Sequence, residues 1–81
     1  MDRTADGVEV REGLVCYDNN LDVVVVGKPL PYGNPAEPTW YSTTYYEGGG
    51  KGPSQDASRL STTFRDYNGK RWVAPQVVGL P

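Results

Sequence analysis

The chain has 81 residues, enough for one small domain, and a formal net charge of −2 at pH 7 from 8 Lys or Arg and 10 Asp or Glu. The absence of His and the single cysteine, Cys16, exclude an internal disulfide and a zinc site built from Cys and His. No apolar run approaches the ~18 residues of a membrane-spanning helix, and the acidic net charge disfavours general nucleic-acid binding.

The first third of the chain predicts short extended elements separated by turns. Residues 8–11 alternate apolar and polar side chains, which is typical of a half-buried extended segment. Residues 14–17 predict a strand, and the turn-forming run DNN at 18–20 ends it. Residues 21–27, LDVVVVG, predict a central strand buried on both faces, because four β-branched valines disfavour a helix and fit a pleated sheet.

The rest of the chain continues this pattern. Residues 28–38, KPLPYGNPAEP, predict a loop, because four prolines disfavour both a helix and a central strand. Residues 39–46, TWYSTTYY, predict an aromatic-rich strand that a glycine turn follows. Further along we expect a short strand with one helical turn capped by Asp56 or Ser58, another short strand at 61–64, and a type I′ hairpin turn at Asn68-Gly69. About five short strands joined by tight turns predict an all-β fold, a small antiparallel barrel.

Several short motifs follow one another in a recognisable order: Asp6-Gly7, Gly13-Leu14 with Cys16 and Asp18, Leu21, Val24-Val25, Trp40-Tyr41, Gly48-Gly49 and Ser58-Arg59-Leu60. This order resembles that of small SH3-like barrel proteins of actinobacteria and their phages, many of which have no assigned activity. The resemblance implies an SH3-like barrel over residues 6–64, an extension over residues 65–81 that packs on it, and a phage or actinobacterial origin. The proline-rich loop at 28–38 and the long tail beyond Phe64 depart from the pattern.

The chain offers no set of catalytic residues, so we do not expect an enzyme, a cofactor or a metal site. Cys16 has no His to act as its base, and strand alternation places it beside Leu14 as a small buried side chain. Asp18 and Asp22 flank a turn, which Asp18 is well suited to hold through backbone N–H groups. The unpaired thiol favours a reducing, cytoplasmic setting, the host cytoplasm if the chain is phage-encoded.

Strand alternation also predicts which aromatic rings face outward. If Leu14 and Cys16 face inward, Tyr17 faces outward. If the alternate side chains Tyr41, Thr43 and Tyr45 face inward, Trp40 and Tyr46 face outward. The candidate partner-binding residues are Tyr17, Tyr32, Trp40, Tyr46 and Trp72. Together with the apolar tail they favour a module that binds a protein partner or a second copy of itself. The competing interpretation is that the C-terminal segment folds back and covers these rings.

Basic residues gather late in the chain. Four cations against one anion, Asp66, give residues 59–72 a local charge of +3. Mixed with Tyr67 and Trp72, these cations could bind a nucleic-acid strand by charge pairing and stacking. The candidate residues for this alternative function are Arg59, Arg65, Lys70 and Arg71. The simpler interpretation is an ordinary solvated hairpin.

Overall fold

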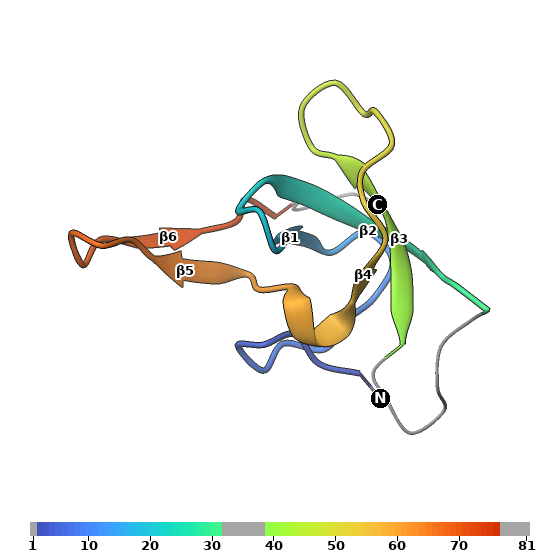
Figure 1. Ribbon diagram of the computed structural model, residues 1–81, viewed down its shortest axis with the longest axis horizontal. Helices are drawn as coiled ribbons and strands as arrows, with labels where there is room; N and C mark the ends of the chain where they lie inside the picture. The colour runs from blue at the N-terminus through green and yellow to red at the C-terminus, as the bar shows by residue number, and fades with distance from the viewer. Residues whose placement is uncertain (1, 32–38, 77–81) are drawn as a thin grey trace.

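Figure 1 shows the computed structural model, which describes residues 2–31 and 39–76. Its elements are β1 (Val15–Tyr17), β2 (Val23–Pro29), β3 (Trp40–Tyr45), β4 (Gln55–Asp56), the 3₁₀ helix η1 (Ala57–Arg59), β5 (Thr63–Arg65) and β6 (Arg71–Val73). Strands β1 to β4 form one antiparallel sheet in sequence order, and β5 pairs with β6 in a separate hairpin. The four-stranded sheet curls into a half-barrel, so the prediction of an all-β, SH3-like barrel is confirmed.

The valine strand β2 lies between β1 and β3, as predicted. Val24 and Val26 are fully buried in a cluster with Leu14, Cys16 and Leu60. On the opposite face Val23 and Val25 are only half-buried, and they pack against a second cluster made of Val15, Tyr17 and Ala74, with Phe64. The prediction of burial on both faces therefore holds completely for one face and in part for the other.

The edge of β1 that faces away from β2 is paired by two residues that flank the β5–β6 hairpin, Ser61 before β5 and Gln76 after β6. The Tyr17 N–H donates to the Ser61 carbonyl at 2.7 Å, and the Ser61 N–H donates to the Tyr17 carbonyl at 3.1 Å. Two residues earlier, the Val15 N–H donates to Gln76 Oε1 at 3.2 Å, while Gln76 Nε2 donates to the Val15 carbonyl at 2.8 Å. A side-chain amide thus replaces a neighbouring strand, and the buried backbone groups at this edge are paired.

Three turns share one geometry. In each, a side-chain oxygen accepts a hydrogen bond from the backbone N–H four residues later. The residue three positions after the accepting residue has positive φ. The accepting residues are Thr4, Asp18 and Asp66, and the positive-φ residues are Gly7, Leu21 and Gly69. The predicted role of Asp18 in holding its turn is therefore confirmed.

The prediction of a type I′ turn at Asn68-Gly69 is wrong. A type I′ turn needs positive φ at both central residues, whereas only Gly69, at φ 83°, has it. The Gly69 N–H donates to the Asp66 carbonyl at 2.9 Å, and the Asp66 N–H donates to the Lys70 carbonyl at 2.9 Å. The result is a three-residue loop, which the Asp66 side chain stabilises by accepting from the N–H groups of Asn68 and Lys70.

The half-buried extended segment expected at residues 8–11 is present in part: Val10 is half-buried against the core and Glu9 forms a bridge with Arg3, but Val8 is exposed. One further expectation needs correction. Strand β2 continues through Lys28 to Pro29, two residues into the predicted loop. Pro29 is tolerated there because the register shifts between Val26 and Pro29, at the end of the strand, where a ladder N–H is not required.

Candidate functional site

Exposed apolar side chains gather in two places. Among the described residues, the large hydrophobic side chains open to solvent are Val8, Leu21, Tyr45, Tyr46, Tyr67, Trp72 and Val73. Leu21, Tyr45 and Tyr46 line one groove, and the last three belong to the β5–β6 hairpin. A folded monomer of this size exposes single apolar residues routinely, but clustered ones mark binding surfaces.

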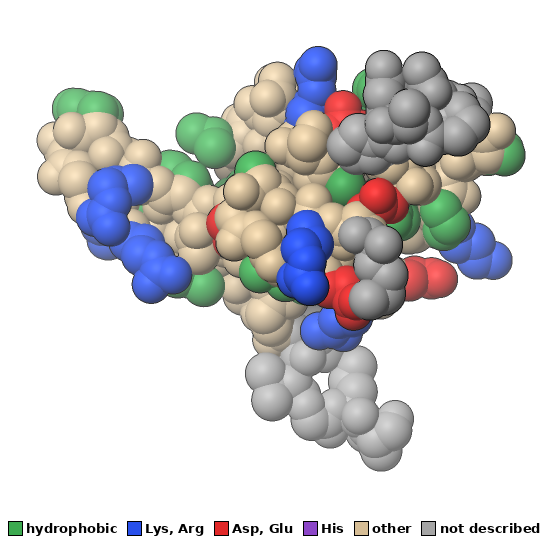
Figure 2. Space-filling view, turned by 90° about the horizontal axis from the view of Figure 1, so that it is seen from below, with side chains coloured by type: hydrophobic (Ala, Val, Ile, Leu, Met, Phe, Trp, Pro, Cys, Tyr) green, Lys and Arg blue, Asp and Glu red, His purple; other side chains and the backbone are tan. Residues whose placement is uncertain are grey.

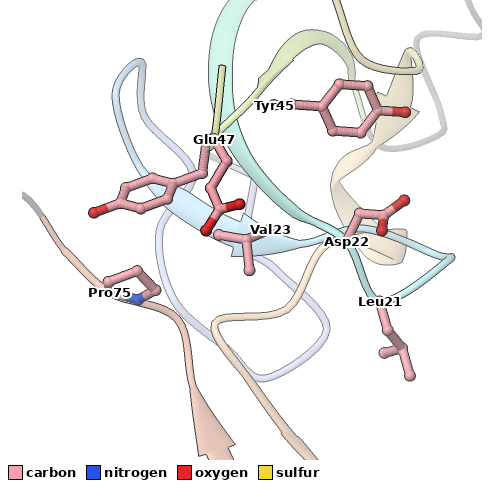
Figure 3. Close-up of a pocket in the computed structure, with 7 residues that line it drawn as sticks. Leu21, Asp22, Val23, Tyr45, Glu47 and Pro75 are labelled. Carbon is pink, nitrogen blue, oxygen red and sulfur yellow. The ribbon is translucent and has the colours of Figure 1, made fainter. Parts of the chain in front are cut away.

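The groove, here called the Tyr46 groove, has a volume of about 530 Å³. It lies between the β1–β2 turn, the end of β3 and the segment that follows β6. Figure 3 shows Pro75 on one side, Tyr45 and Asp22 on the other, and Val23 between them. Its lining residues are Leu21, Asp22, Val23, Tyr45, Tyr46, Glu47 and Pro75.

Local chain geometry explains why these residues line one groove. The Tyr46 N–H donates to the Val23 carbonyl at 3.0 Å, which keeps Tyr46 beside β2 after β3 has ended. Gly48 and Gly49 then take positive φ values of 82° and 69° and turn the chain away. On the other side, Leu21 sits at φ 64° in the Asp18 turn, with its side chain 55 % exposed.

The groove carries negative charge. Asp22 and Glu47 are both exposed, and none of the described residues that line the groove is a cation. Within residues 2–31 and 39–76 the only ion pair joins Arg59 to Asp56, at 3.3 Å. The two groove carboxylates therefore have no cationic partner within the part of the chain that the structure describes. Apolar rings beside unpaired carboxylates suit a ligand that is both apolar and cationic.

The expectation that Tyr17 faces solvent is wrong. Its side chain is 7 % exposed, because Phe64 covers it edge-on with ring centroids 4.7 Å apart at 85°. Ala74 belongs to the same buried cluster. The ring that covers Tyr17 is Phe64 of β5, which precedes the C-terminal segment of the competing interpretation, and Ala74 is the described residue of that segment in the same cluster.

The other predicted partner-binding residues lie apart from one another. Tyr46 is 44 % exposed and lines the groove. Trp72 is 42 % exposed on the hairpin, and Trp40 is half-buried at the opposite end of β3, where its backbone pairs with Asp56. Tyr32 and the apolar tail after residue 76 fall outside the described residues. Of the five predicted rings, the structure places one in the groove.

Sequence reasoning missed most of the groove. Tyr45, expected to face inward, is 37 % exposed because it is the last residue of β3 and the half-barrel no longer covers it. Leu21, Glu47 and Pro75 were not singled out. The run of glycines at 48–50 is the signal that could have located the end of β3, and with it the exposure of Tyr45.

The β5–β6 hairpin projects from the body of the molecule (Figure 1). Phe64 and Trp72 stack across it with centroids 6.2 Å apart at 10°, and Lys70 Nζ lies 4.2 Å from the Trp72 ring centre. Trp72 Nε1 donates to Asp66 Oδ2 at 3.0 Å, which lowers the pKa of Asp66. Arg65 Nη1 donates to the Gly69 carbonyl at 2.6 Å. These contacts order the hairpin even where it is exposed.

The four predicted basic residues are not all on one element. Arg65, Lys70 and Arg71 belong to the hairpin, whereas Arg59 lies in η1 and pairs with Asp56. Figure 2 shows Lys and Arg side chains gathered at the hairpin end of the molecule. The hairpin therefore carries three of the Lys and Arg side chains of the described residues on one projecting element.

Neither the thiol nor the carboxylates show a catalytic arrangement. Cys16 is fully buried, and burial raises the pKa of its thiol to about 12, so the reactive thiolate is not accessible at neutral pH. Asp18 is 3 % exposed and its Oδ1 accepts the N–H groups of Asn20 and Asp22.

In residues 2–31 and 39–76 no group of three or more Cys, Asp or Glu side chains could hold a metal ion. None of the helices there is long and apolar enough to cross a membrane.

Comparison with protein-family models, curated protein sequences and solved structures gives no significant match. These comparisons therefore assign neither a family nor a function to the chain.

Proposed function

We propose that this protein is a non-catalytic interaction module that binds a segment of a protein partner in the Tyr46 groove. One observation carries the proposal: three exposed apolar side chains from separate parts of the chain line a single groove, namely Leu21 in the β1–β2 turn, Tyr45 at the end of β3 and Tyr46 directly after it. Tyr is among the residue types enriched in the few side chains that supply most of the binding energy at protein interfaces.

The charges around the groove define the kind of segment. Asp22 and Glu47 lie at the groove without a described cationic partner, so a partner that brings Lys or Arg beside an apolar side chain satisfies both features. The groove is open and small. We therefore expect a short segment to bind it with modest affinity, rather than a whole protein surface.

Selection from a library of short random peptides displayed to the intact chain tests this function. The expected peptides place Lys or Arg next to Leu, Tyr or Trp. In calorimetry with a selected peptide, Tyr46→Ala should weaken binding about 10-fold or more, the effect of losing one buried aromatic anchor. The matched control is Val8→Ala, which removes an exposed apolar side chain outside both the groove and the hairpin. Equal binding by the wild type and Tyr46→Ala would overturn the proposal.

Nucleic-acid binding by the hairpin is the second candidate. Arg65 and Arg71 are direct cross-strand partners, and like charges in that position destabilise a hairpin unless an anion lies near them. A phosphate backbone would be such an anion. Binding of single-stranded DNA or RNA should then weaken steeply with salt and with Arg71→Ala. Absence of binding at about 50 mM salt removes this candidate.

A further inference from the structure

The two exposed apolar groups of this molecule carry opposite charges. The Tyr46 groove combines Leu21, Tyr45 and Tyr46 with the carboxylates of Asp22 and Glu47. The hairpin combines Tyr67, Trp72 and Val73 with three cations: Arg65, Lys70 and Arg71. The groove therefore has carboxylates without cations, and the hairpin has an excess of cations, so the two surfaces are complementary in charge.

The single anion of the hairpin does not cancel this complementarity. Asp66 is held by its own turn, since Oδ1 accepts the N–H groups of Asn68 and Lys70, and Oδ2 accepts Trp72 Nε1. Arg71 has no such internal partner among the described residues, and its position opposite Arg65 adds a repulsion that an incoming carboxylate would relieve.

The shape of the molecule favours contact between copies. The hairpin extends away from β2 and β3, and its tip lies at one end of the long axis (Figure 1). Tyr67 at this tip is 98 % exposed. The stack of Phe64 on Trp72 and the bond from Arg65 to the Gly69 carbonyl hold the hairpin in shape, so little ordering entropy is lost on docking.

We propose that the β5–β6 hairpin of one copy docks in the Tyr46 groove of a second copy, with Arg71 facing Asp22 and Glu47. This inference rests on the proposed function, because it names the segment that the groove binds. The contact joins two different surfaces, so it leaves a free groove at one end and a free hairpin at the other. Repetition therefore builds an open chain or a ring instead of a symmetric dimer.

Sedimentation velocity on the intact chain tests the proposal. The average sedimentation coefficient should rise with protein concentration, and the rise should shrink at about 0.5 M salt, where the charge attraction is screened. Glu47→Lys should abolish the rise by closing the groove to a basic hairpin. The double variant Lys70→Ser/Arg71→Ser should do the same by removing two of the hairpin's three cations. Glu12→Lys makes the same charge change at an exposed site outside the groove and should behave as the wild type.

Mixing the two variants gives the sharpest result. Glu47→Lys keeps a normal hairpin and the double variant keeps a normal groove, so an equimolar mixture should form dimers and nothing larger. A wild type that stays monomeric up to about 1 mM, or a mixture that stays monomeric while the wild type associates, overturns the self-docking. A monomeric wild type that still binds selected peptides through Tyr46 would overturn this inference alone and leave the proposed function standing.

Discussion

Replacement of Gln76 by Ala should destabilise the protein although Gln76 is itself exposed. Within the described parts of the chain, its amide is the only group that pairs with both the N–H and the carbonyl of Val15 at the outer edge of β1, and Val15 is fully buried. Each hydrogen bond contributes a net stabilisation of about 1 kcal/mol, and water can reach part of the vacated site. The expected loss is therefore about 1–2 kcal/mol, equivalent to a Tm lower by about 5–15 °C for a domain of this size.

Urea unfolding followed by tryptophan fluorescence measures this loss. Gln76→Glu is an informative companion, because a carboxylate can accept from the Val15 N–H but cannot donate to the Val15 carbonyl. It should be at least as destabilising as Gln76→Ala. Glu12→Ala, at an exposed site without a side-chain hydrogen bond, should change stability by less than about 0.5 kcal/mol. An unchanged urea midpoint for Gln76→Ala would refute the assignment of Gln76 as the closing group of the β1 edge.

Three further results are expected. Leu21→Gly should stabilise the fold by about 0.5–1 kcal/mol in urea unfolding, because Leu21 holds a positive φ that glycine adopts without strain; Leu21→Ala should not. Burial alone would raise the pKa of Asp6, but hydrogen bonds from Thr4 and Thr62 outweigh it and lower the pKa from 3.8 to about 2. A carboxyl group whose pKa is lower in the folded than in the unfolded chain stabilises the fold at pH values above the unfolded pKa. About 1 kcal/mol of the free energy of unfolding, after allowance for solvent screening, should therefore be lost as the pH falls from 3.8 towards 2. Asp6→Asn should abolish that dependence in pH-dependent unfolding, and an unaltered acid profile would contradict it. Cys16 should resist a thiol reagent at pH 8 until urea unfolds the chain, and fast labelling of the folded protein would contradict its burial.

Several local features of the chain were predictable from its sequence, although the type of the turn at Asn68-Gly69 was not. Consecutive β-branched residues at 23–26 could form only a strand without strain, and their apolar character required neighbours on both sides. The turn at Asp18 was predictable too, because its carboxylate reaches backbone N–H groups within four residues. These predictions succeeded because the interactions that decide them lie close together along the chain.

The covering of Tyr17 was not predictable in the same way. Alternation shows that Val15 and Tyr17 share a face, but it does not say what packs on that face. The answer depends on Phe64 and Ala74, which are distant from Tyr17 in sequence and lie on the two sides of the β5–β6 hairpin turn. The groove was missed for a related reason, since its walls come from three separate parts of the chain that no periodicity connects: the β1–β2 turn, the end of β3 and the segment after β6.

The most direct test of the Tyr46 groove as the binding surface is an NMR titration. The tightest selected peptide is added to the ¹⁵N-labelled intact chain, at a protein concentration where the chain is monomeric. The amide signals of Leu21, Val23, Tyr46 and Glu47 should shift together and saturate, while that of Tyr67 stays in place. Shifts confined to the hairpin, or spread evenly over the half-barrel, would contradict the assignment of this groove.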